Sequence, residues 1–125
     1  MLDMYAEEIL ERYKDPVNKG VIKNATSEVH ETNPLCGDSL DIYLKIESGK
    51  ITDAKFNGFG CAISQASADI LLGIVKGKGV ENAKNTTKDN FLKTLGISLS
   101  PARLKCALLS WHALMIAIGN RQNGH

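Results

Sequence analysis

Three cysteines and one aspartate are the residues of this chain whose types best suit chemistry with metals or sulfur. Cys36, Cys61 and Cys106 are its only cysteines, and Asp38 follows Cys36 two positions later in the stretch Cys-Gly-Asp. Side chains at i and i+2 of an extended segment point to the same side, so the Cys36 thiol and the Asp38 carboxylate can face one centre. Taken alone, Asp38 is better explained as a turn carboxylate that accepts a hydrogen bond from a neighbouring N–H.

Each cysteine is predicted to lie at a junction between elements. Cys36 precedes a strand, Cys61 begins a helix, and Cys106 lies in the second turn of another helix. The positive end of a helix dipole stabilises a thiolate, the form that binds metal or accepts sulfur. Gly58 and Gly60 are expected to leave room for a ligand near the backbone. The competing interpretation is plain burial, since free cysteine is commonly an inert core residue.

The donor set narrows the choice of metal. Three thiolates and one carboxylate suit Zn²⁺ or iron held by sulfur, and the oxygen ligand leaves one corner labile. No Cys-x-x-Cys pair is present, so the spacing alone is a weak signal. The histidines add little, because His112 lies roughly 240° around its helix from Cys106 at 3.6 residues per turn. His30, on the expected first strand, could approach the Cys36 loop.

Two cations occupy an unusual place at the start of the last predicted helix. Arg103 stands at the third helical position, where Glu or Gln is usual, and Lys105 follows it. Cations there are unfavourable by about 0.3–1 kcal/mol each. Arg103 shares a helix face with Cys106, three residues on. Both cations would be explained by an anionic partner such as a thiolate, persulfide or sulfide; a salt bridge to a carboxylate on another element is the alternative.

The hydrophobic pattern predicts three short antiparallel strands after one helix. Residues 3–14 are expected to be helical and to end at Asp15-Pro16; the proposed apolar positions are Met4, Ile9, Leu10 and Tyr13. The stretch 26–34 is expected to be extended, and residues 39–60 to form a hairpin that turns at 48–50. The sheet would have one face to cover.

The remainder of the chain is predicted to be helical. One helix begins at Cys61 and ends near Gly77, with a stripe of Ile63, Ala66, Ile70 and Ile74. One or two short helices are expected within 80–95. A long helix has Ser100 as N-cap, Pro101 first and Gly119 after its end; its stripe would be Leu104, Leu108, Trp111, Met115 and Ile118. The fold class is therefore α+β, a small three-stranded antiparallel sheet packed against helices.

The bulk composition limits the classes of function. The 125 residues, 43% hydrophobic, are expected to form one domain over residues 1–125. A net charge of +1 offers no electrostatic basis for binding nucleic acid or an anionic membrane. The apolar runs look shorter than the roughly 20 residues of a membrane span, and the acidic amphipathic N-terminus is unlike a secretory signal. We therefore expect a cytoplasmic protein with reduced thiols.

Three stretches, residues 33–46, 51–78 and 99–114, resemble the blocks of the IscU/SufU/NifU N-terminal family of iron–sulfur cluster assembly scaffolds. The resemblance implies an α+β, IscU/NifU-like fold with Cys36, Asp38, Cys61 and Cys106 around one metal site. Lys105 replaces the histidine usual in IscU proteins, and "LSPAR" replaces the segment read by an Hsp70-type chaperone. "PARLKC" is closer to SufU proteins, but the insertion of about twenty residues usual there between the second and third cysteines is missing.

Three functions follow from this resemblance. The first is a scaffold for a [2Fe–2S] cluster that receives sulfur from a cysteine desulfurase, as a persulfide on Cys106 or Cys36, and serves recipient apo iron–sulfur proteins. The second is a zinc-dependent sulfur acceptor of the SufU type with Zn²⁺ on the same four residues. The third is a structural zinc domain that only binds partners. Whether the chain is an enzyme, and whether it forms a homodimer, stay open at this level.

Overall fold

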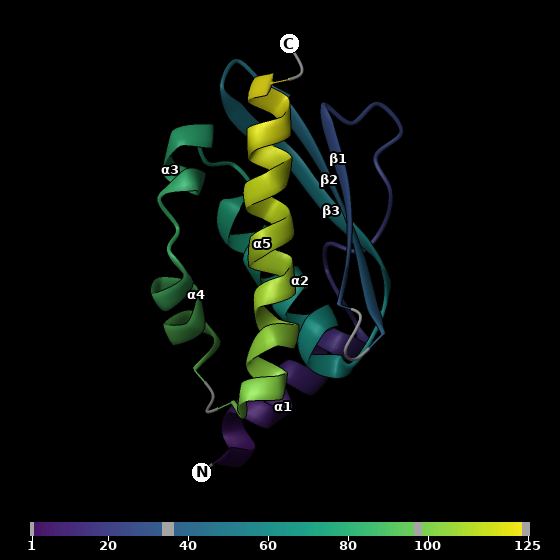
Figure 1. Ribbon diagram of the computed structural model, residues 1–125, viewed down its shortest axis with the longest axis vertical. Coiled ribbons are helices and arrows are strands. Elements are labelled where there is room, and N and C mark those ends of the chain that lie inside the picture. The colour runs from purple at the N-terminus through teal and green to yellow at the C-terminus, as the bar shows by residue number, and fades with distance from the viewer. Residues whose placement is uncertain (1, 34–36, 97–98, 124–125) are drawn as a thin grey trace.

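The computed structural model describes the backbone of residues 2–33, 37–96 and 99–123, and the side chains of 7–33, 37–96 and 99–119. Within these residues, five helices lie on one side of a three-stranded sheet (Figure 1). The elements are α1 (Leu2–Lys14), β1 (Ser27–Asn33), β2 (Asp38–Glu47), β3 (Lys50–Phe59), α2 (Ala62–Val75), α3 (Val80–Lys84), α4 (Lys88–Leu95) and α5 (Pro101–Asn123). The predicted α+β class is confirmed.

The sheet is an antiparallel meander in the order β1-β2-β3. β2 and β3 are joined at Ser48 and Gly49, whose φ angles of 52° and 77° are both positive, as in the tight turns that match strand twist. Alternate residues of β2 are fully or nearly fully buried: Leu40, Ile42, Leu44 and Ile46. The expected hairpin and its core face are confirmed.

Helices cover one face of the sheet (Figure 1). α5 packs against β1 and β2, α2 packs against β3, and the two helices pack against each other. α3 and α4 lie on the side of α5 away from the sheet, and α1 packs against α2. α2 is therefore enclosed by the sheet, α5 and α1, which explains why most of its residues are buried.

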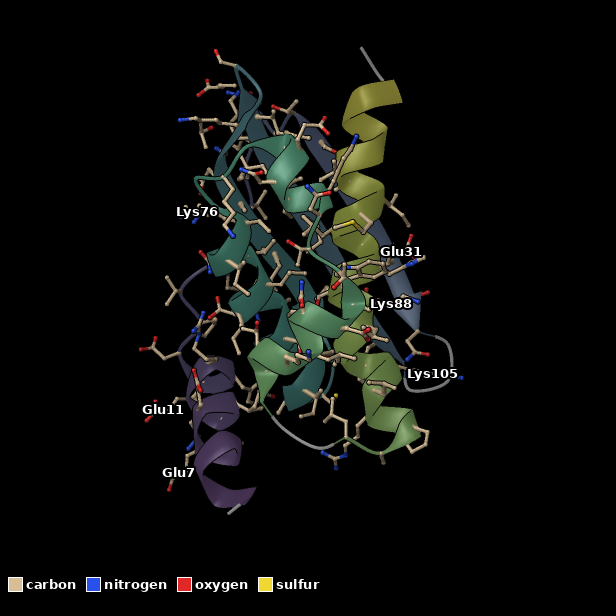
Figure 2. All side chains as sticks on the ribbon, turned by 90° about the vertical axis from the view of Figure 1, so that its left-hand side faces the viewer. Glu7, Glu11, Glu31, Lys76, Lys88 and Lys105 are labelled. Atoms are coloured by element: carbon tan, nitrogen blue, oxygen red, sulfur yellow. The ribbon has the colours of Figure 1, made fainter. Side chains whose placement is uncertain are left out.

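A partly buried ion pair joins α1 to α2. Arg12 Nε donates a hydrogen bond of 2.6 Å to Asp69 Oδ2, and the backbone N–H of Asn18 donates one of 2.7 Å to Oδ1. Ile9 reaches the core, whereas Leu10 and Tyr13 are 46% and 44% exposed, contrary to their predicted place among the apolar positions of this helix. Glu7 and Glu11 point outward from α1 (Figure 2). The hydrogen bonds to Asp69 and the burial of Ile9 together hold α1 against the rest of the molecule.

The predicted stripes of the two long helices are partly wrong. On α2, Ile70 and Ile74 are half-buried at the edge of the core, and the centre is instead Leu71, Leu72 and Val75. On α5, only Ile118 of the predicted stripe is buried; Leu104, Leu108, Trp111 and Met115 are half-buried, and the inner face is Cys106, Ala107, Leu109, Ser110, Ala113, Leu114, Ala117 and Ile118. Small residues line this face because α5 lies close to both the sheet and α2.

α5 differs from the prediction in two further ways. It continues through Gly119 to Asn123, since one glycine inside a helix costs only about 1 kcal/mol. Its stretch Pro101–Gly119 is long and apolar enough to cross a membrane by length and composition alone, contrary to the expectation that the apolar runs are too short. The packing of this stretch against the sheet and α2 accounts for its composition.

Candidate metal centre

Three of the four predicted ligands meet at one end of the sheet. The ligand atoms of Asp38, Cys61 and Cys106 all lie within 4.8 Å of one another. They come from the first residue of β2, the N-cap of α2 and the second turn of α5. Cys36 lies outside the described residues, so its predicted place in the group stays a prediction.

Asp38 combines the two roles that the sequence left as alternatives. The residue is 2% exposed, and its Oδ1 accepts a hydrogen bond of 3.1 Å from the backbone N–H of Cys61. Its Oδ2 accepts a longer contact of 3.7 Å from the Cys61 thiol. The carboxylate therefore holds the start of α2 and faces the thiols at the same time.

Gly60 makes this position of Asp38 possible. A Cβ on Gly60 would lie 2.6 Å from Asp38 Oδ1 and 2.7 Å from Ser64 Oγ, closer than real Cβ contacts. A Cβ on Gly58 would lie 2.2 Å from the backbone oxygen of Ser39. The predicted reason for these glycines, room for a ligand, is wrong: the carboxylate and the neighbouring strand occupy that space. The sequence prediction did not include this contact between Gly60 and Asp38.

Cys61 is the accessible thiol of the group. It is the N-cap of α2, with extended backbone angles of φ −71° and ψ 166°, and its side chain is exposed. The first turn of α2 holds no acidic residue, so the positive end of the dipole faces the thiol without a competing charge within that turn. This placement confirms the predicted start of the helix at Cys61.

Cys106 is deeper than expected. It is 5% exposed and belongs to the apolar core, which agrees with plain burial, the competing interpretation of the sequence. The inner face of α5 begins at this residue, and its sulfur lies close to the ligand atoms of Asp38 and Cys61. Burial and metal ligation are therefore compatible at this position.

The separations fit a metal with sulfur ligands. Two sulfurs on one tetrahedral zinc ion lie about 3.8 Å apart at a Zn–S bond of about 2.3 Å. The observed limit of 4.8 Å requires movements of about an ångström or less. Since thiolate is a soft ligand, this donor set suits zinc or iron–sulfur chemistry rather than Mg²⁺ or Ca²⁺.

A pocket of about 450 Å³ opens beside the thiols. It is lined by Asn33, Cys61, Ala62, Ile63, Ala102, Arg103, Lys105 and Cys106. The start of α5 is capped as predicted, because Ser100 Oγ accepts the Arg103 N–H at 3.4 Å. The two helix N-termini and the two cations thus surround one opening; the side chain of Lys105 is labelled in Figure 2.

Within the part of the chain that the structure describes, the two cations do not form the salt bridge that the sequence allowed as an alternative explanation. Among the described residues, neither Arg103 nor Lys105 forms an ion pair, and both are exposed. Their positive charges and the two helix dipoles point to the same opening. This arrangement favours an anionic group in or beside the pocket.

The histidines lie elsewhere. His30 is on β1, as expected, but on the outer face of the sheet, where it pairs with Asp41 of β2. The hydrogen bond and the charge of Asp41 raise the pKa of His30 above its ordinary value of 6.5. His112 is exposed on α5. Neither residue belongs to the metal-ligating group found among the described residues.

Comparison with known proteins identifies the family. The family profile described as the NifU-like N terminal domain matches residues 4–123. The chain belongs to this family. The resemblance that the three cysteine blocks suggested is therefore confirmed, and the three-stranded sheet with its helices is the fold of this family.

Relatives of this NifU-like domain carry two functional names. The chain is 35% identical to the zinc-dependent sulfurtransferase SufU of Bacillus subtilis (strain 168), over 98% of this chain and 94% of that protein. It is also 35% identical to the iron–sulfur cluster assembly scaffold protein IscU 1 of Archaeoglobus fulgidus, over 97% of this chain and 80% of that protein. Identity alone does not separate the two names.

A solved structure gives the same fold. The crystal structure of an iron–sulfur cluster assembly scaffold protein for the SUF system from Fervidobacterium islandicum AW-1 matches with a TM-score of 0.78 and 32% identity, over 93% of this chain and 97% of that one.

The alignment with the Bacillus protein runs over 139 positions, more than the 125 residues of this chain. The Bacillus protein therefore has residues without a counterpart here, in agreement with the expected lack of the insertion usual in SufU proteins.

Proposed function

We propose that this NifU-like domain is a scaffold on which a [2Fe–2S] cluster is assembled in the cytoplasm and from which it passes to apo iron–sulfur proteins. The convergence of Asp38, Cys61 and Cys106 at an open end of the sheet carries the proposal. Cys36, two residues before Asp38, would complete four ligands for iron held by sulfur. A cysteine desulfurase would supply the sulfur.

Asp38 would make the cluster releasable. A carboxylate is a harder ligand than thiolate and binds iron of a sulfur cluster less tightly. Because Asp38 also accepts the Cys61 N–H, it keeps a hydrogen-bond partner when it leaves the metal. Release of the cluster therefore does not strand a buried charge without any partner, which would cost several kcal/mol.

Sulfur would arrive by persulfide exchange. The thiolate of Cys106 or Cys36 attacks the outer sulfur of the donor persulfide and forms a new S–S bond, while the S–S bond of the donor breaks and the donor leaves as a thiolate. The outer sulfur keeps its proton, and no net oxidation occurs. The pocket gives access to Cys106, and Arg103 and Lys105 would stabilise the anionic groups during this exchange.

A second candidate is a zinc-dependent sulfur acceptor. It is favoured by the identity to SufU and by Arg103, three residues before Cys106. Zn²⁺ would occupy the same four residues until a ligand from the desulfurase displaces Cys36, which then takes the sulfur. A purely structural zinc domain would need the metal only for folding.

The test is cluster assembly and transfer under anaerobic conditions. The protein is mixed with a cysteine desulfurase, cysteine and Fe²⁺, visible charge-transfer absorption is followed, and an apo-ferredoxin is then added. Absorption that grows and then moves to the ferredoxin is expected. Absence of a cluster, together with zinc-loaded protein that carries a persulfide and accelerates the desulfurase, would replace the scaffold with the sulfur acceptor.

A further inference from the structure

Among the described residues, few large apolar side chains are exposed, and one of them lies at the metal centre. These side chains are Leu10, Tyr13, Val17, Val21 and Phe59. Phe59 is 66% exposed and is the last residue of β3, two positions before Cys61. An aromatic ring left in water forgoes about 1.5–3 kcal/mol of burial, so its position beside the thiols calls for an explanation.

Strand register shows what surrounds Phe59. It pairs with Ser39 of β2, and Ser39 pairs with Thr32 of β1, so these three side chains form the end row of the outer sheet face. The next row consists of His30, Asp41 and Asn57. We call these six residues the Phe59 surface. α2 and α5 cover the opposite face, and the surface therefore presents one aromatic ring beside hydrogen-bonding groups, the composition of a binding hot spot.

The Phe59 surface is continuous with the thiol site in all three strands. Thr32 precedes Asn33, which lines the pocket; Ser39 follows Asp38; and Phe59 leads through Gly60 to Cys61. The Phe59 surface and the pocket therefore share one end of the sheet, and one protein partner that brings sulfur to the pocket can contact both.

We propose that the Phe59 surface docks the protein that donates sulfur, an inference that rests on the proposed function. Arg103 and Lys105 line the pocket from α5, whereas Phe59 lies on the sheet. The donor then carries its persulfide between an apolar socket, which receives Phe59, and acidic side chains, which face Arg103 and Lys105. Ring burial supplies affinity, and charge complementarity orients the donor.

The test measures donor binding separately from cluster chemistry. Binding of the cysteine desulfurase of the source organism is measured by calorimetry for the wild type, Phe59→Ala, Phe59→Leu and the control Tyr13→Ala, which removes an exposed aromatic ring from α1. Phe59→Ala is expected to raise Kd at least 10-fold, Phe59→Leu to retain most of the affinity, and Tyr13→Ala to leave Kd within twofold. Loading with Fe²⁺ and inorganic sulfide, which needs no donor protein, stays unchanged in all three variants.

Several outcomes would overturn the docking proposal. A Kd for Phe59→Ala within twofold of the wild type would do so, as would a wild type that does not bind the desulfurase. Loss of sulfide-driven loading in Phe59→Ala would assign the ring to the metal site instead. Failure of the proposed function looks different: the wild type would bind the desulfurase through Phe59 yet form no cluster with either source of sulfur.

Discussion

One buried carboxylate, Asp69, lies on α2, another, Asp38, lies at the start of this helix, and their surroundings differ. Asp69 is 0% exposed and is held by the Arg12 guanidinium and the Asn18 backbone N–H. Asp38 is 2% exposed and lies against the Cys61 N–H and the thiols of Cys61 and Cys106. Burial is the same in both, but the partners of Asp69 are fixed donors of hydrogen bonds, whereas those of Asp38 include groups that can bind metal.

This difference separates a structural carboxylate on α2 from a carboxylate of β2 that faces the thiols. The charge of Asp69 is balanced by Arg12, a cation that joins α1 to α2. Loss of Asp69 should therefore lower the free energy of unfolding. The oxygens of Asp38 can bind either the N–H at the start of α2 or a metal ion. Loss of Asp38 should therefore change mainly how long a metal ion or a cluster stays bound.

The largest expected effect is on folding. Asp69→Ala leaves Arg12 facing a buried site without its anion, and the free energy of unfolding should fall by about 3 kcal/mol. Arg12 is 29% exposed, which keeps the loss toward the lower end of the range for buried pairs. Urea unfolding followed by circular dichroism measures it.

A matched control is Asp53→Ala. Asp53 pairs with Lys76 at 3.3 Å, but both side chains are more than a third exposed, at 37% and 39%. Solvent-exposed pairs of this kind contribute less than about 1 kcal/mol. Equal losses for Asp69→Ala and Asp53→Ala would remove the structural role assigned to the Arg12–Asp69 pair.

Gly60→Ala should damage the metal centre more than the fold. The new Cβ would displace the Asp38 carboxylate from the Cys61 N–H and the thiols. We expect zinc affinity to fall by about 10- to 100-fold, as for loss of a group that supports a metal ligand. Competition with a chromogenic chelator measures this affinity.

Gly119→Ala is the control for Gly60→Ala. Gly119 lies within α5, and a Cβ there meets nothing within 4 Å. This variant should keep its zinc affinity and gain about 0.5–1 kcal/mol of stability. If Gly60→Ala binds zinc as tightly as Gly119→Ala, then the position of Asp38 at the metal centre does not depend on the absence of a side chain at residue 60.

Asp38→Ala should lengthen the life of an assembled cluster. The variant removes the oxygen ligand that we propose as the labile corner, and transfer to apo-ferredoxin should slow by about threefold or more. Loss of the hydrogen bond to Cys61 should lower stability by only about 1 kcal/mol. Faster loss of the cluster than in the wild type would show that Asp38 retains the cluster instead of releasing it.

The smallest effect concerns Asp41, a half-buried carboxylate on the outer face of the sheet, whose loss should change stability least. The hydrogen bond and charge of Asp41 raise the pKa of His30 above 6.5 in the folded protein. The pair therefore stabilises the fold fully below about pH 6.5, and this contribution is lost as pH rises through the folded pKa. Asp41→Asn should return the pKa of His30 toward 6.5 in an NMR titration and lower Tm only on the acidic side. A Tm difference that grows at alkaline pH would contradict this sign.

Much of the site and its setting could be predicted from the sequence, because the relevant signals are local. The position of Cys61 at the start of a helix, the hairpin after Asp38 and the Ser100 cap each depend on a few neighbouring residues. The spacing of the cysteines was only weak evidence that the ligands converge, because no Cys-x-x-Cys pair is present. The family resemblance supplied that prediction.

What sequence reasoning missed depends on contacts between distant elements. The burial of Cys106 follows from the packing of α5 against the sheet, and the wide buried face of α2 follows from its enclosure on three sides. The reason for Gly60 is a carboxylate that lies 22 positions away in the chain. A periodicity within one helix cannot reveal how many neighbours that helix has.

One measurement decides most directly whether Asp38, Cys61 and Cys106 act as a single metal centre. X-ray absorption at the zinc edge of the reconstituted protein should show sulfur at about 2.3 Å and one oxygen ligand at about 2.0–2.2 Å. Cys61→Ser and Cys106→Ser should each remove one sulfur from this set, and Asp38→Ala should remove the oxygen and no sulfur. A zinc ion bound mainly by nitrogen and oxygen, unchanged in these variants, would contradict the shared centre.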